Sequence, residues 1–205
     1  MKNNLQGWLS IYKPVNISSF QVIKKIKAKY NIKKIGHAGT LDPLAEGILP
    51  IAIEKTTKLI SFINNEIKEY EFEIKWGEQT STDDREGYVV EKSCNIPVHH
   101  EINLKLKNFK GKILQTPPKA SAVKVNGVRA YKLLRSNIDF EIKKKYVHIY
   151  ESKIINSINK NITKMKIKCG KGFYVRSFAR DLAEQLGTKA HIFSLKRTKV
   201  GKFCL

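Results

Sequence analysis

The clearest alternation of hydrophobic and polar positions in the chain lies in residues 69–76. Tyr70, Phe72, Ile74 and Trp76 alternate there with Glu and Lys residues. A period of two residues is typical of a β-strand with one face in a core and the other in solvent. The segment is therefore predicted to be a strand with one polar face.

Helical patterns occur at two places. Ser18 and Gln21 form the S-x-x-Q pattern of a capping box, and apolar residues follow it at Phe20, Val22, Ile23 and Ile26. This combination predicts a helix that runs from about residue 19 to 30. A second helix is predicted over 174–186, because Gly187 is suited to ending it.

The remaining elements are short. A loop is predicted over residues 36–47, where three glycines and a proline interrupt any periodicity. Asn126-Gly127 between apolar pairs predicts a β-hairpin. Further strands are expected at 7–12, 48–53, 88–91, 120–125, 128–129, 146–155, 162–169 and near the end of 191–203, and short helices at 54–63 and 98–109.

Strands thus outnumber helices and are joined mostly by hairpins. This pattern favours an α+β fold, with a large mixed, mostly antiparallel sheet flanked by helices and loops. No internal repeat and no Pro/Gly/Ser-rich linker divides the sequence. We therefore expect residues 1–205 to form a single domain.

Charge points to a polyanionic partner. The chain has 39 Lys and Arg residues against 18 Asp and Glu residues, a net charge of +21. Such an excess favours nucleic acid binding. Only six of the basic residues are Arg, and Lys, Ile and Asn are all plentiful, so AT-rich codons also account for part of the charge. Candidate phosphate contacts are Lys110, Lys112, Lys119, Lys124 and the lysines at 143–145.

Several other classes of function are disfavoured. No apolar run approaches the roughly 20 residues of a membrane-spanning helix, and the start of the chain does not resemble a signal peptide. The three cysteines are far apart, and the pair His99-His100 stands alone, so we expect neither disulfides nor a metal site. A cytoplasmic protein that does not bind membranes is expected.

The loop at 36–47 contains the most promising chemistry. Its glycines allow the backbone to bend tightly and to approach a ligand closely. His37 and Asp42 are the side chains that can do acid–base or nucleophilic work there, together with Glu46. On local grounds, however, Asp42 before Pro43 is better explained as an ordinary turn residue.

The fifteen residues from Gly36 to Pro50, GHAGTLDPLAEGILP, closely resemble the catalytic motif of bacterial tRNA pseudouridine-55 synthases. Other segments resemble the same family in the same order along the chain. They are Lys13-Pro14, Lys68-Glu69-Tyr70, Gly172 to Ser177, Ala190-His191 and Leu195 to Thr198. The resemblance extends from Gly7 to Phe203, nearly the whole chain.

This resemblance implies a pseudouridine synthase fold and a cofactor-independent isomerisation of uridine 55 in the T-loop of tRNA. The N-glycosidic bond breaks, the uracil rotates, and its C5 bonds to C1′ of the ribose. Asp42 matches the nucleophile, which attacks either the sugar or the base. The target uridine must first leave its stack. The implied partner is the tRNA T-arm, and the implied enzyme is a monomer with no obligatory protein partner and no metal.

The resemblance also assigns a pocket around the nucleophile. Arg176 matches an arginine that pairs with the aspartate and keeps it ionised. His37 matches a residue beside the site that the flipped base vacates. Tyr70 matches the ring that stacks on the uracil. Tyr174 and Leu195 match further positions in the pocket wall. Tyr70, Tyr174 and Leu195 are each also compatible with packing in a hydrophobic core.

Bacterial members of the family usually continue into a C-terminal RNA-binding domain, whereas this sequence ends after the catalytic-domain elements, which leaves its choice of RNA open.

Two alternative functions stay open. A guide-RNA-dependent synthase would use the same chemistry. A basic RNA-binding or RNA-folding module without turnover would explain the charge, but it would not require Asp42, Tyr70 and Arg176 together.

Overall fold

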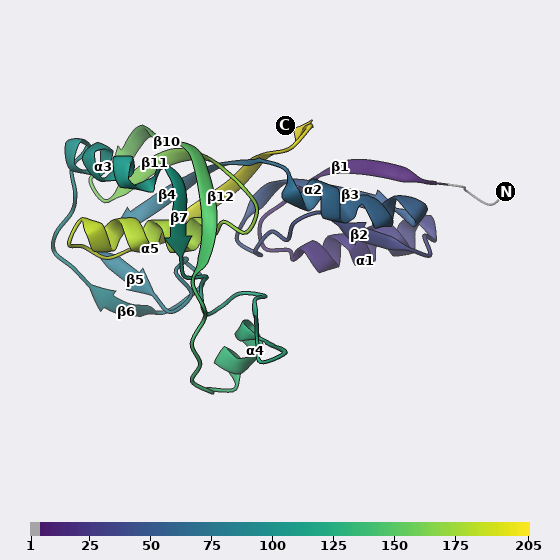
Figure 1. Cartoon of the computed structure of the whole chain (residues 1–205), viewed down its shortest axis with the longest axis horizontal. Coiled ribbons are helices and arrows are strands. Elements are labelled where there is room, and N and C mark those ends of the chain that lie inside the picture. The colour runs from purple at the N-terminus through teal and green to yellow at the C-terminus, as the bar shows by residue number, and fades with distance from the viewer. Residues whose placement is uncertain (1–4) are drawn as a thin grey trace. The chain divides into compact units, whose positions relative to one another are not determined.

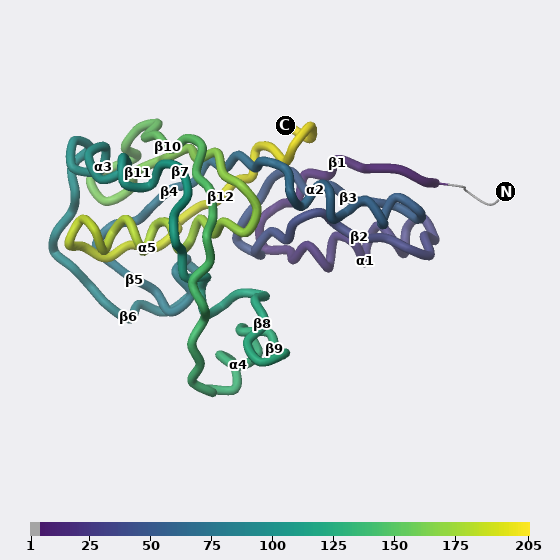
Figure 2. Tube along the Cα trace, in the orientation of Figure 1, coloured from purple at the N-terminus to yellow at the C-terminus, as the bar shows by residue number. Residues whose placement is uncertain are grey.

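A computed structural model describes residues 5–205 of the chain (Figure 1, Figure 2). The chain divides into two compact units. Unit 1 comprises Met1–Glu71 and Ser194–Leu205, and unit 2 comprises Phe72–Phe193. Two long strands, β4 (Lys68–Trp76) and β12 (Ala190–Val200), begin in one unit and end in the other. Each unit is described by itself below.

Unit 1 is built around a buried central strand, β3 (Glu46–Ile53). β1 (Gly7–Lys13) pairs with it antiparallel along its whole length, with Lys13 opposite Gly47. On the other edge of β3, the short strand β2 (Ile35–His37) pairs antiparallel, and β12 pairs parallel. The strand order in this unit is β1-β3-β12-β4, and β13 (Phe203–Cys204) pairs with β12.

Helix α1 (Ser19–Tyr30) begins at the predicted capping box. The backbone N–H of Gln21 donates to the Ser18 hydroxyl, and the backbone N–H of Ser18 donates to the Gln21 side chain. The helix ends at Asn31, which adopts the left-handed conformation with φ of 49°. The segment predicted as a helix over 54–63 is a 3₁₀ helix, η1 (Glu54–Leu59), that continues into α2 (Ile60–Asn65).

Unit 2 contains strands in the order β12-β4-β11-β10-β7. Its long hairpin pairs β10 (Lys145–Asn159) with β11 (Ile162–Cys169), and β7 (Gly111–Gln115) pairs with the start of β10. Three helices accompany these strands: α3 (His99–Leu106), η2 (Lys107–Phe109) and α5 (Val175–Gln185). Aromatic rings make the core, because Phe178 of α5 contacts both Phe72 and Phe109 edge to face.

Two small hairpins complete unit 2. One pairs β5 (Glu78–Thr80) with β6 (Val89–Lys92). The other pairs β8 (Lys124–Val125) with β9 (Val128–Arg129) and leads into the short helix α4 (Ala130–Arg135). Figure 2 shows β8, β9 and α4 in one continuous segment of the chain. Asn126 and Gly127 between them have φ of 49° and 83°, the positive values that a tight hairpin turn requires.

The α+β fold with a large, mostly antiparallel sheet is confirmed. The predicted loop at 36–47 was too long, because its first residues belong to β2 and its last to β3, which leaves residues 38–45 as the loop. Gly36 and Gly47 lie within these strands rather than in the turn. Within residues 5–205, no helix combines the length and apolar character needed to cross a membrane.

Candidate active site

Lys13 holds the loop at 38–45, which carries Asp42, by hydrogen bonds to main-chain atoms. This lysine is the last residue of β1 and its side chain is fully buried. Its ammonium group donates to the carbonyl oxygens of Pro14, Ile17 and Pro43, at 2.9, 2.6 and 3.3 Å. A buried ammonium requires such partners because it has left water. Lys13 therefore fixes the main chain next to Asp42 and brings a positive charge to the loop.

Ser19 holds the residue on the other side of Asp42. Its hydroxyl donates to the carbonyl of Leu41 at 3.0 Å and accepts from the N–H of Leu41 at 2.9 Å. Ser19 is buried in the first turn of α1. This two-way contact satisfies both main-chain groups of Leu41 and ties the loop to the helix.

Arg197 of β12 holds the start of the loop. Its guanidinium donates to the carbonyl oxygens of Ile48 and Gly39, at 2.8 and 2.9 Å, and lies 3.5 Å from the carbonyl of Thr40. Its side chain is almost entirely buried. The planar fork of arginine suits this task because it directs several N–H groups at different carbonyls at once.

Gly47 allows β3 to approach β12 closely at this point. It pairs with Arg197 in the parallel register and has φ of 111°. A Cβ atom at this position would collide with the backbone of Arg197. The glycine thus has two reasons to be there, a backbone conformation that other residues avoid and the absence of space for a side chain.

His37 lies at the end of β2, opposite Ile51 of β3. Its Nδ1 atom is buried and has no hydrogen-bond partner in unit 1 or elsewhere among the described residues. Burial lowers the pKa of His37 below its usual value, and the positive charge of Arg197 lowers it further. The neutral form of the imidazole is therefore favoured at pH 7.

Asp42 is partly exposed, and its carbonyl accepts from the N–H of Ala45 in the turn that ends the loop. Tyr70 and Leu195 also belong to unit 1. Tyr70 lies near the start of β4 and is half-buried, unlike Phe72 further along that strand. Leu195 is buried in β12. Four of the six predicted site residues, including His37, are thus in this unit.

Tyr174 and Arg176 belong to unit 2, where they begin helix α5. Gln115, at the end of β7, makes a two-way contact with Tyr174: its side-chain carbonyl accepts from the N–H of Tyr174 at 2.9 Å, and its amide donates to the carbonyl of Tyr174 at 3.1 Å. Ser177 donates to the carbonyl of Thr116 at 2.7 Å. These bonds fix the N-terminus of α5 and with it the direction of both predicted site residues.

Arg176 is buried among main-chain carbonyls. Its guanidinium donates to the carbonyl oxygens of Thr82 and Ala120, at 3.0 and 3.2 Å. It also lies 3.4 Å from the carboxylate of Asp84, and both side chains are about 95% buried, with 5% and 3% exposed. Asp84 in turn accepts from the hydroxyl of Thr82 and the N–H of Glu86. Such a saturated network holds the arginine in one orientation.

A second arginine extends this network one turn later in α5. Arg180 donates to the carboxylate of Asp83 at 2.7 Å and to the carbonyl of Thr116 at 2.8 Å. Burial raises the pKa of Asp83, and the charges of Arg180 and Arg176 oppose that rise. The turn at Asp83-Asp84 is therefore buried and ionic.

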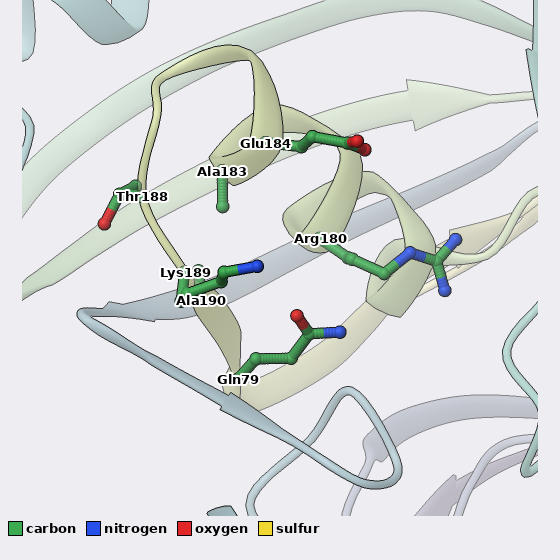
Figure 3. Close-up of a pocket in the computed structure, with 7 residues that line it drawn as sticks. All are labelled: Gln79, Arg180, Ala183, Glu184, Thr188, Lys189 and Ala190. Atoms are coloured by element: carbon green, nitrogen blue, oxygen red, sulfur yellow. The ribbon is translucent and has the colours of Figure 1, made fainter. Parts of the chain in front are cut away.

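Arg180 also lines a small cavity of about 170 Å³ between α5 and the start of β12 (Figure 3). Gln79, Glu184 and Lys189 supply the other polar side chains of its wall. Lys189 is already paired with Glu91. The cavity contains none of the six predicted site residues.

The sequence analysis did not identify the residues that position the site. Lys13 and Arg197 belong to segments that had been matched to the family, but neither was assigned a role. The one available signal was the charge of Lys13, which ends a segment of mostly apolar residues, whereas Arg197 lies among polar neighbours. Ser19, Gln115 and Asp84 gave no such signal, because their partners are distant in the sequence.

Comparison with known proteins relates the chain to one family. Residues 27–175 match the family described as "TruB family pseudouridylate synthase (N terminal domain)". The chain is 49% identical to tRNA pseudouridine synthase B of Wolbachia pipientis subsp. Culex pipiens (strain wPip) and 46% identical to that of Ehrlichia ruminantium (strain Gardel), in each case over 97% of this chain. It covers 57% of the first relative and 68% of the second.

Solved structures show the same fold. The protein in the crystal structure of a Cbf5-Nop10-Gar1 complex superimposes with a TM-score of 0.75 and is 27% identical, over 97% of this chain and 50% of that one. The chain thus spans little more than half the length of several proteins that it matches. With its family match covering most of the sequence, the chain belongs to the TruB family of pseudouridylate synthases.

Proposed function

We propose that this protein isomerises uridine 55 in the T-loop of tRNA to pseudouridine, with Asp42 as the nucleophile. The observation that carries the proposal is the loop at 38–45, which Lys13, Ser19 and Arg197 hold by main-chain contacts on both sides of Asp42. Catalysis by a carboxylate requires this kind of fixed position, because a misplaced nucleophile loses much of its rate.

The other site residues serve the same reaction. Arg176 pairs with Asp42 and orients its carboxylate. His37, neutral at pH 7, lines the space that the flipped nucleotide leaves. Tyr70 stacks on the uracil, and its hydroxyl assists removal of the proton from C5. Tyr174 and Leu195 complete the pocket wall.

The reaction balances without any cofactor or metal. The bond from C1′ to N1 breaks, the uracil turns, and C1′ bonds to C5. The proton on C5 leaves and N1 gains one, so uridine and pseudouridine are isomers. The proposal also includes a single catalytic domain over residues 1–205. This domain acts on the T-arm as a monomer in the cytoplasm, without an obligatory protein partner.

An assay on an unmodified T-arm transcript tests the assignment. The native chain should form pseudouridine at the single position that corresponds to uridine 55. Asp42→Ala should form none, because no other side chain of the loop at 38–45 is a carboxylate. Binding of the transcript by the native chain without product would support the RNA-binding module instead. Product formed by Asp42→Ala would exclude Asp42 as the nucleophile.

A further inference from the structure

One side of strand β10 carries a row of aromatic residues that the proposed reaction does not use. Tyr146, His148 and Tyr150 are exposed, whereas Val147 and Ile149 between them are buried. Because alternate residues of a strand point to the same face, the three rings lie along one side of the sheet. Tyr146 is 66% exposed and Tyr150 is 44% exposed, so both rings are accessible to a ligand.

Two rings of this aromatic row contact each other, and the third contacts a cation. The centroids of His148 and Tyr150 are 4.4 Å apart, and their planes are tilted by 46°. The ammonium group of Lys112 lies 4.2 Å from the ring centroid of Tyr146. Lys112 belongs to β7, whose register places it opposite His148 and places the exposed Leu114 opposite Tyr146. The row is thus a flat, partly apolar surface with a cation on it.

Positive charge also surrounds the aromatic row. Lys145 precedes it and is exposed. At the other end, Gly170 donates its N–H to the carbonyl of His148, and the exposed Lys171 follows directly. The acidic residue next to the row, Glu151, is 3.4 Å from Lys153. The surface therefore presents cations beside exposed rings.

We propose that this face of unit 2 binds single-stranded RNA. Bases stack on Tyr146 and Tyr150, and phosphates contact Lys112. Aromatic rings beside cations are the usual combination for single strands, because every base has a face that can stack and every nucleotide has a phosphate. A duplex does not fit, since its base faces are covered by neighbouring bases. The inference rests on the proposed function for the nature of the ligand, RNA, and adds a second contact outside the catalytic pocket.

Binding of a fluorescently labelled single-stranded oligouridylate to the full chain tests this proposal. The variant Tyr146→Val/Tyr150→Val removes both rings but keeps residues that favour strands. Its affinity should fall about tenfold or more, whereas Tyr146→Phe/Tyr150→Phe should stay within about twofold of the native chain. Tyr88→Val is the matched control, because Tyr88 is 76% exposed and lies outside the row.

Three outcomes would overturn the proposal: unchanged affinity in the valine variant, an equal loss on double-stranded RNA, or equally effective competition by polyglutamate. The last two would indicate general attraction of polyanions. Pseudouridine formation on the T-arm transcript, measured separately from oligouridylate binding, separates this proposal from the proposed function. Failure of the native chain to make pseudouridine would reject the isomerase activity, while a tenfold loss in the valine variant would still support the RNA surface.

Discussion

At the scale of single residues, the site depends on buried cations that donate to main-chain carbonyls. Lys13, Arg176 and Arg197 are each at most 4% exposed and each donates to two or more carbonyl oxygens. Removing such a cation leaves several buried acceptors without partners, which costs about 1–3 kcal/mol for each. These residues therefore do structural and electrostatic work at the same time.

Arg176→Lys should lower pseudouridine formation far more than RNA binding. Arg176 reaches the carbonyls of Thr82 and Ala120 with two different guanidinium nitrogens, and the single ammonium nitrogen of a lysine cannot occupy both of their positions. Activity on the T-arm transcript and its dissociation constant should be measured side by side, with Arg135→Lys, at an exposed position of α4, as the control. Equal losses in activity and binding would make Arg176 a phosphate contact instead.

His37 should make stability depend on pH. Its pKa is lower in the folded chain than in the unfolded chain, so the unfolded chain binds the proton first as pH falls. The free energy of unfolding should then be fully present above about pH 6.5 and decrease as pH falls below it. Urea denaturation at several values between about pH 5 and pH 7 measures this.

The variant His37→Gln should remove that part of the pH dependence. His100→Gln provides the control, because His100 is exposed on α3. If the native chain and His37→Gln lose stability in parallel as pH falls, another group is responsible for the decrease.

At the scale of elements, the close parallel contact between β3 and β12 determines where the loop at 38–45 begins and ends. Gly47→Ala should destabilise the protein by about 2 kcal/mol or more, through both its positive φ and the collision with the backbone of Arg197. Gly111→Ala is a matched control, since Gly111 also has a positive φ, 84°, but has open space around it. Equal thermal shifts in the two variants would show that φ alone matters.

The elements that sequence patterns predicted well are those with local signals. The capping box at Ser18 placed α1, the alternation in β4 placed its buried face, and Asn126-Gly127 placed the hairpin. The parallel pairing of β12 with β3 was not predictable, because it joins residues about 150 positions apart and leaves no periodic trace. β2 was missed for the same reason, since a three-residue strand is defined only by its partner.

The same division applies to the site. Asp42 was found only through a long motif shared with a family, because its local sequence is also that of a turn. Arg176 donates hydrogen bonds to Thr82 and Ala120, which lie 94 and 56 residues before it in the chain. No sequence pattern spans such a separation. Whether Arg176 also pairs with Asp42 stays a prediction.

At the scale of the whole molecule, the charge of +21 should make RNA binding strongly dependent on salt. Each phosphate that is neutralised releases counterions, so the logarithm of the association constant should fall linearly with the logarithm of salt concentration. Titrations of the T-arm transcript at several potassium chloride concentrations give the slope, and Lys112→Ala should reduce it by about one. A slope near zero would contradict an electrostatic role for the lysines.

The contacts that hold the loop at 38–45 all end on its main chain, and this has a consequence for protein engineering. Ser19, Lys13 and Arg197 bond to backbone atoms of Leu41, Pro43 and Gly39, whatever side chains the loop carries. Thr40 is exposed and its side chain takes no part in these bonds. A labelled or unnatural amino acid can therefore be introduced at position 40 as a reporter beside Asp42, without dismantling the support that keeps the aspartate in place.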